Sequence, residues 1–212
     1  MSAPSVYSYP NSYEINKHGE DVMSLQPKQT LSFEEWLEGE RAVLEGRSEF
    51  VDGEVFAMTG ASLAHNAIVS NINREISIQL KKRPCQVYAN DVKVLIRSAN
   101  AARYPDLVAL CGEPELLDDR CDVLLNPSLI VEVLSDSTEA YDRGDKFALY
   151  RQLPSLQEYL LVSQNRVGVE LYTRGTDGRW TLSDYAALTD RVPLTSIDCT
   201  LALSEVYDKL RG

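Results

Sequence analysis

One glutamate interrupts the most apolar stretch of the chain. Glu132 stands between Leu129–Val131 on one side and Val133–Leu134 on the other. Burying an ionised carboxylate without a partner costs so much free energy that the group holds its proton instead, so a glutamate here needs a cation or a function. Two interpretations are open: a structural salt bridge to a basic residue, and a catalytic or metal-binding carboxylate.

A second carboxylate precedes an apolar run of the same type. Asp106 follows Pro105 and leads into Leu107–Leu110. Proline followed by aspartate before a strand is unspecific alone, because aspartate is common at turns and proline is tolerated at the first residue of a strand. Carboxylates on adjacent strands can point into the same space, however, and two such oxygens with a backbone carbonyl supply half a magnesium shell. Asp106 and Glu132 together therefore suggest an oxygen-ligand site for Mg²⁺ or Mn²⁺.

A cation is available on the segment that follows Glu132. Lys146 lies in a predicted helix, four residues after Asp142, and Tyr150 lies one turn further on. The simplest interpretation of Lys146 is a surface pair with Asp142, which contributes only a few tenths of a kcal/mol, roughly. Tyr150 is expected to be a core aromatic residue with its hydroxyl at the rim.

These residues need a sheet and helices to position them. Ser32 and Glu35 form a capping-box pattern before a short helix to about residue 41, and Asp52-Gly53 predicts the turn of a hairpin over residues 48–58. Apolar residues recur every four positions over residues 62–82, which predicts the longest helix, with Ser62 as its N-cap. Further strands are expected at 87–90, 92–96, 107–110, 129–134, 159–162, 167–173 and 180–185, and further helices at 139–153 and 204–210.

This pattern predicts one α/β or α+β domain, in which helices flank a mixed central sheet. The domain is expected to span residues 29–212. Residues 1–28 carry tyrosine, serine, proline and asparagine without an apolar period and are expected to form a flexible tail.

Composition narrows the classes of function. The chain has 212 residues and a formal net charge of -11, so no global positive field attracts nucleic acid or an anionic membrane. We expect a cytoplasmic protein, because no apolar stretch approaches the ~20 residues that span a bilayer and the first residues do not form a secretory leader. Two histidines are too few for a zinc site of three imidazoles. The four cysteines, Cys85, Cys111, Cys121 and Cys199, have no metal-like spacing and are expected to be free thiols.

An ordered set of short motifs resembles a known family. The set covers roughly Leu31 to the C-terminus, and its similarity is to the Uma-two family of restriction-endonuclease-like proteins, within the PD-(D/E)XK nuclease superfamily. The resemblance implies a restriction-endonuclease-like core. The motifs are Ser48–Glu54, His65, Asn90–Val92, Tyr104–Leu107, Leu129–Ser135 and Asp145–Tyr150.

The resemblance assigns roles by position. Asp106 matches the aspartate of the PD motif, Glu132 the acidic residue after it, and Val133 the residue X, whose carbonyl would join the metal ligands. Leu134 stands where the superfamily has lysine, and the family pattern nominates Lys146 in its place. Glu49 matches an early acidic residue that would bind a second ion or a water. His65, Asp91 and Tyr150 match recurring positions without a fixed role.

The resemblance implies a magnesium-dependent endonuclease that cleaves double-stranded DNA. Duplex binding needs several basic contacts to phosphate, and a homodimer would pool two such surfaces. The candidate DNA-binding residues are Lys81, Lys82, Arg83, Lys93, Arg97, Arg143 and Arg151.

Two other functions stay open. Leu134 in the position of the motif lysine favours a non-catalytic binding module that retains the nuclease fold. Asp106 and Glu132 could instead serve as the acid and base of a glycosidase, although no aromatic sugar-stacking platform stands near them in the sequence. A GxSxG elbow and glycine-rich nucleotide-binding loops are absent from the sequence.

Overall fold

The computed structural model describes residues 30–58, 60–135 and 138–210. The tail expected over residues 1–28 lies outside the described residues. Within the described residues, no helix has the length and apolar character needed to cross a membrane.

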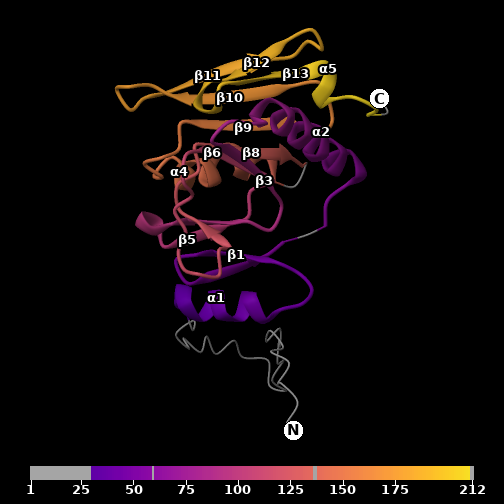
Figure 1. Cartoon of the computed structure of the whole chain (residues 1–212). Coiled ribbons are helices and arrows are strands. Elements are labelled where there is room, and N and C mark those ends of the chain that lie inside the picture. Colours follow the sequence, from indigo (N-terminus) through magenta and orange to yellow (C-terminus); the bar gives the residue numbers. More distant parts are fainter. Residues whose placement is uncertain (1–29, 59, 136–137, 211–212) are drawn as a thin grey trace, which may run out of the picture.

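The strands form three sheets (Figure 1). The five-stranded sheet has the order β2 (Glu54–Ala57), β1 (Ser48–Val51), β5 (Ala101–Arg103), β4 (Lys93–Ile96) and β7 (Val123–Leu124). The six-stranded sheet has the order β11 (Trp180–Tyr185), β10 (Val169–Arg174), β9 (Glu158–Ser163), β8 (Leu129–Leu134), β6 (Leu107–Cys111) and β3 (Cys85–Ala89). β12 (Arg191–Leu194) pairs with β13 (Cys199–Ala202).

The six-stranded sheet is the mixed central sheet predicted from the sequence. β8 and β9 run parallel, whereas β6 is antiparallel to both β3 and β8, and β10 to both β9 and β11. One face packs against α2 (Leu63–Leu80) and α5 (Leu203–Val206). The other face packs against α4 (Phe147–Tyr150) and against apolar residues of β4 and β5. The fold class is therefore confirmed, with the five-stranded sheet as an addition.

Local sequence signals explain several elements. α1 (Phe33–Ala42) begins with the predicted capping box, because the Glu35 amide donates to Ser32 Oγ and the Ser32 amide donates to the Glu35 carboxylate. α2 begins at the predicted cap, where the His65 amide donates to Ser62 Oγ. Asp52 and Gly53 both have positive φ, at 45° and 89°, as a two-residue hairpin turn of type I′ requires.

The helix predicted over residues 139–153 is irregular. It consists of α3 (Glu139–Tyr141), the π-helical turn η2 (Asp142–Lys146) and α4. A π turn holds one more residue than an α turn, so it shifts the side chains that follow around the helix axis. This irregularity lies in the segment that carries Lys146.

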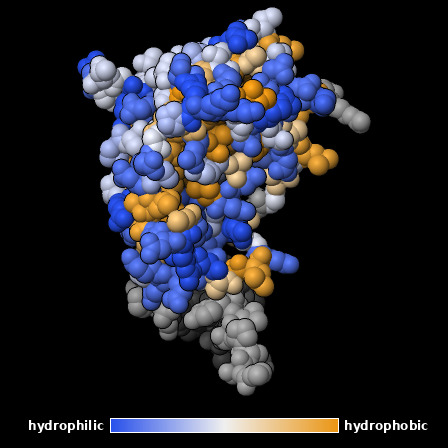
Figure 2. Space-filling model, in the orientation of Figure 1, coloured by the Kyte–Doolittle hydropathy of each residue, from blue (hydrophilic) through white to orange (hydrophobic). Residues whose placement is uncertain are grey.

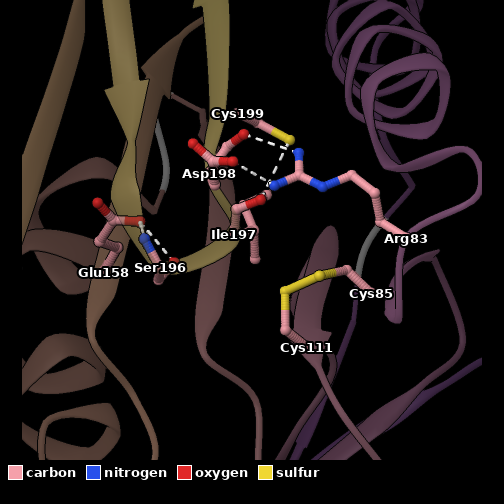
Figure 3. Close-up of a disulfide and its surroundings, with 8 residues drawn as sticks. All are labelled: Arg83, Cys85, Cys111, Glu158, Ser196, Ile197, Asp198 and Cys199. Carbon is pink, nitrogen blue, oxygen red and sulfur yellow. Dashed lines mark hydrogen bonds and ion pairs between the residues drawn. A yellow bond between two sulfur atoms is a disulfide. The ribbon is translucent and has the colours of Figure 1, made fainter.

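One expectation about the cysteines is wrong. Cys85 and Cys111 form a disulfide between β3 and β6 (Figure 3), where they stand directly opposite in the antiparallel register. The 26 residues between them conceal this pairing in the sequence. Cys121 and Cys199 are free thiols, as expected.

The outer surface is mostly hydrophilic. Figure 2 shows hydrophilic residues over most of the visible face, with hydrophobic residues in smaller areas between them. The core, in contrast, continues through both faces of the central sheet. Polar and charged side chains that interrupt this core are therefore the candidates for a functional site.

Candidate active site

Asp106 and Glu132 lie opposite each other on adjacent strands. β6 and β8 are antiparallel with Leu107 opposite Val131, so the next pair in this register is Asp106 opposite Glu132. Opposite residues of an antiparallel pair point to the same face of the sheet. The amide of Val133 donates to Asp106 Oδ2 at 2.7 Å, which fixes this carboxylate against β8. The two acids therefore stand at neighbouring positions, close enough for the charge of Asp106 to raise the pKa of Glu132. Their convergence on one metal ion stays a prediction.

Lys146 is buried against Glu132 and does not lie on the surface. Its Nζ is 2.9 Å from Glu132 Oε1, 3.5 Å from Asp142 Oδ1 and 3.8 Å from Glu49 Oε1. The simple surface pair with Asp142 is therefore wrong, because Asp142 is itself buried and is only one of three carboxylates around the ammonium. The helical segment after β8 places the Lys146 ammonium beside Glu132. Its role as the replacement for the motif lysine stays a prediction.

Burial and opposite charges set the ionisation of this pair. Burial raises the pKa of Glu132 to about 8, and the neighbouring charge of Lys146 limits that rise. Burial also opposes the charged form of Lys146, but the three carboxylates outweigh it and raise the pKa of the ammonium well above its usual value. Lys146 is therefore a fixed positive charge over a wide pH range.

Tyr150 and Lys146 contact the same oxygen of Glu132. The Tyr150 hydroxyl donates to Glu132 Oε1 at 3.0 Å. The side chain is fully buried, so its hydroxyl lies inside the core and not at the rim as expected. The two donors hold Glu132 in one orientation.

Glu49 is held by an arginine that the sequence analysis did not consider. Arg103 donates to Glu49 Oε2 at 2.5 Å, and the amide of Tyr104 donates to Glu49 Oε1 at 3.2 Å. Arg103 is 2% exposed and also donates to the Tyr141 hydroxyl. The only sequence signal for Arg103 is its position two residues before Pro105-Asp106.

His65 reaches Asp106 from the first turn of α2. Its Nε2 lies 2.9 Å from Asp106 Oδ1. Burial opposes protonation of the imidazole, but the hydrogen bond and charge of Asp106, with a backbone hydrogen bond to Val133, outweigh it and raise the pKa of His65. Asp91, in contrast, is exposed, has a positive φ of 53° and pairs with Arg47 at 3.1 Å, so it lies in a surface turn away from these contacts.

The candidate DNA-binding residues differ in their surroundings. Lys93 is buried, with its Nζ 2.9 Å from Asp122 Oδ2, so this residue lies inside the fold and not on a DNA-facing surface. Arg83 pairs with Asp198 (Figure 3), and Arg143 pairs with both Glu139 and Glu170. The four that are exposed are Lys81, Lys82, Arg97 and Arg151.

The donors suit a hard divalent cation. In the described part of the chain, no group of three histidine, cysteine, aspartate or glutamate side chains is arranged to hold a metal ion. Mg²⁺ needs fewer protein ligands, because it usually keeps several waters and is held by one or two carboxylates. Asp106 and Glu132, with the carbonyl of Val133 next to them, match that donor set.

Comparisons with known proteins show the family of this chain. Residues 32–204 match the model of the Uma2 family, described as "Putative restriction endonuclease", and the chain belongs to this family. The uncharacterized protein slr1290 of Synechocystis sp. (strain ATCC 27184 / PCC 6803 / Kazusa) is 37% identical over 181 residues, which are 85% of this chain and 93% of that protein. The uncharacterized protein sll1609 of the same organism is 34% identical over 163 residues, 77% of this chain and 92% of that protein.

A solved structure supports the same fold. The crystal structure of a "putative nuclease belonging to DUF820" from Anabaena variabilis ATCC 29413 aligns with a TM-score of 0.68 at 15% identity, over 84% of this chain and 97% of that one. The family and the fold together define a nuclease-like protein. The roles of the individual site residues stay predictions.

Proposed function

We propose that this protein is a divalent-metal-dependent endonuclease that hydrolyses phosphodiester bonds in DNA. The observation that carries the proposal is the buried Lys146 ammonium, 2.9 Å from Glu132 Oε1, on the face of the sheet where Asp106 stands opposite Glu132. Two acids at neighbouring strand positions, with a lysine beside one of them, resemble the catalytic set of the superfamily, although Leu134 occupies the usual position of the lysine.

Asp106, Glu132 and the Val133 carbonyl would hold the ion, Mg²⁺ or Mn²⁺. A bound ion supplies positive charge beside the scissile phosphate and makes a nearby water more acidic. His65 and the Val133 amide fix the two oxygens of Asp106, and Tyr150 fixes Glu132. Lys146 stays protonated and stabilises negative charge that develops on the phosphate in the transition state. Glu49, held by Arg103, would bind a water or a second ion beside Lys146.

The direct test is cleavage of duplex DNA in Mg²⁺ or Mn²⁺ by the parent protein and by Asp106→Asn and Glu132→Gln. We expect cleavage by the parent, loss of cleavage in EDTA, and a loss of at least about 100-fold in rate in each variant. Asp91→Asn is the matched control, because Asp91 is exposed and paired only with Arg47 on the surface. Equal cleavage by all four proteins would exclude the assigned acids.

A parent protein that cleaves no DNA in either metal would favour a nuclease-fold binding module instead. Calorimetry separates the nuclease from the binding module. The proposed nuclease should bind Mn²⁺, and Glu132→Gln should weaken that binding. We further propose a cytoplasmic homodimer that pools the basic surfaces of two chains, which size-exclusion chromatography with light scattering would test.

A further inference from the structure

Three arginines without a carboxylate partner lie together in this acidic protein. Among the described residues, Arg97, Arg151 and Arg174 form no ion pair, and neither do Arg120, Arg166 and Arg191 elsewhere in the chain. Arg41 and Arg143, in contrast, each contact two acids. Burial lowers the pKa of Arg174, and no carboxylate charge opposes this effect. A chain with a formal charge of -11 therefore leaves local positive charge uncompensated here.

Hydrogen bonds join the three chain segments that carry these arginines. Arg174, at the end of β10, donates to the backbone carbonyls of Arg151 and Pro154. Ser98, next to Arg97 in the turn η1 (Arg97–Ala99), donates to the side chain of Gln152 at 3.0 Å. Arg97 and Arg151 are both exposed. Figure 1 shows α4 and the tip of the β10–β11 hairpin on the same side of the molecule.

Two aromatic side chains, Trp180 and Phe147, connect Arg174 to the segment that carries Lys146. The Arg174 guanidinium lies 4.8 Å from the ring centroid of Trp180, and Trp180 packs edge-on against Phe147 at 5.2 Å. Phe147 follows Lys146 directly in the chain. Phe147, Trp180 and the six-stranded sheet residue Ile130 belong to one core, so Arg174, which lies against Trp180, is on the same face of the sheet as Phe147.

We infer that Arg97, Arg151, Arg174 and Trp180 form a phosphate-binding surface for a nucleic-acid backbone that continues beyond the candidate active site. Arginine is weakly hydrated and presents several donors that match phosphate oxygens, and a guanidinium already oriented by an aromatic ring loses little freedom on binding. Trp180 adds a face on which an unpaired base can stack. The inference rests on the proposed function for the choice of nucleic acid as the ligand.

The test is fluorescence anisotropy of a fluorescein-labelled DNA duplex in EDTA, with the full chain, across a series of salt concentrations. Removal of two phosphate contacts in Arg97→Gln/Arg151→Gln should lower the slope of log K against log salt by about 2 and weaken binding about ten-fold at low salt. The matched control is Arg120→Gln/Arg191→Gln, which removes the same charge from two other exposed arginines without ion pairs. Thermal unfolding would show that both variants fold.

A slope that falls in the first variant and stays at the parent value in the control supports the inference. Equal slopes in the two variants would overturn it, as would equally tight, arginine-dependent binding of polyglutamate, which would define a general polyanion surface. Cleavage in Mg²⁺ or Mn²⁺ is measured separately on the same proteins. If the parent binds through this surface but never cleaves, the proposed function fails and the surface stands; if it cleaves while the slopes are equal, only the surface fails.

Discussion

Two buried glutamates on neighbouring strands differ in what neutralises them. Glu132 on β8 contacts an ammonium and a tyrosine hydroxyl, within a group of further charges. Glu158 at the start of β9 accepts only neutral donors: the amide and hydroxyl of Thr195 and of Ser196, at 2.5–3.0 Å. A carboxylate that accepts from neighbouring backbone amides holds a turn in place. The proposed function predicts a different role for Glu132, because perturbed, cation-paired carboxylates cluster at functional sites.

The difference between Glu132 and Glu158 predicts that DNA cleavage needs the positive charge beside Glu132. Lys146→Met should lower the DNA cleavage rate at least about 100-fold, because it removes the positive charge nearest to the candidate metal ligands. The measurement is single-turnover cleavage in Mg²⁺. Asp145→Asn, at the exposed neighbouring position, should cleave at the parent rate. If Lys146→Met cleaves as fast as this control, Lys146 has a structural role and no catalytic one.

Glu158 should behave in the opposite way. Glu158→Ala leaves two buried amides and two hydroxyls without their acceptor, so the free energy of unfolding should fall by about 3 kcal/mol or more. Chemical denaturation measures the loss, and the cleavage rate per folded molecule should stay unchanged. A variant with parent stability and reduced cleavage would reverse the assignments of the two glutamates.

The disulfide between Cys85 and Cys111 tests whether a contribution to stability can be separated from a contribution to cleavage. β6 follows Asp106 at one end and carries Cys111 at the other, where it is joined to β3. Cys85→Ser/Cys111→Ser should lower the free energy of unfolding by about 3 kcal/mol, because the disulfide constrains the unfolded chain. Cleavage should persist below the new melting temperature. Loss of cleavage in the folded variant would show that the covalent link positions Asp106.

Asp122 is a third carboxylate, and it tests how much a charge pair nearer the surface contributes to the stability of the fold. Hydrogen bonds from Arg41, opposed in part by burial, and contacts with Lys93 lower the pKa of Asp122 far below its usual value. A lowered carboxyl pKa stabilises the fold above the unfolded value of 3.8, and this contribution is lost as the pH falls through the folded value. Asp122→Asn should therefore cost about 1 kcal/mol at pH 7 and progressively less below pH 4, because the pair is partly screened by solvent. Parallel stability curves for the two proteins from pH 7 to pH 2 would contradict this.

Local signals predicted much of the fold. The caps at Ser32 and Ser62 and the Asp52-Gly53 turn act within a few residues, so the sequence alone locates the first helices and the hairpin. β5 was missed because Ala101–Arg103 is too short and too poor in β-branched residues to indicate a strand. The pair β12 and β13 was missed as well, and its strands have four residues each.

The sequence predicts the site residues whose positions are set by strands, but not those whose positions depend on tertiary packing. Asp106 and Glu132 precede or interrupt buried runs, so their placement at neighbouring strands could be inferred. The burial of Lys146 depends on an irregular helix, and that of Arg103 on a partner, Glu49, that is 54 residues away in the sequence. The Cys85–Cys111 link depends on the pairing of two strands, which spacing does not reveal.

The π-helical turn over Asp142–Lys146 also constrains how this segment can change in length. Each residue of a helix advances the next side chain by about 100°, so deleting Gly144 would swing either Lys146 or the residues before it to another side of the axis. Glycine at this position has no neighbour within 4 Å of an added Cβ, so substitution there is sterically free while deletion is not. The segment should accept changes of side chain at residue 144 and reject any change in the number of residues.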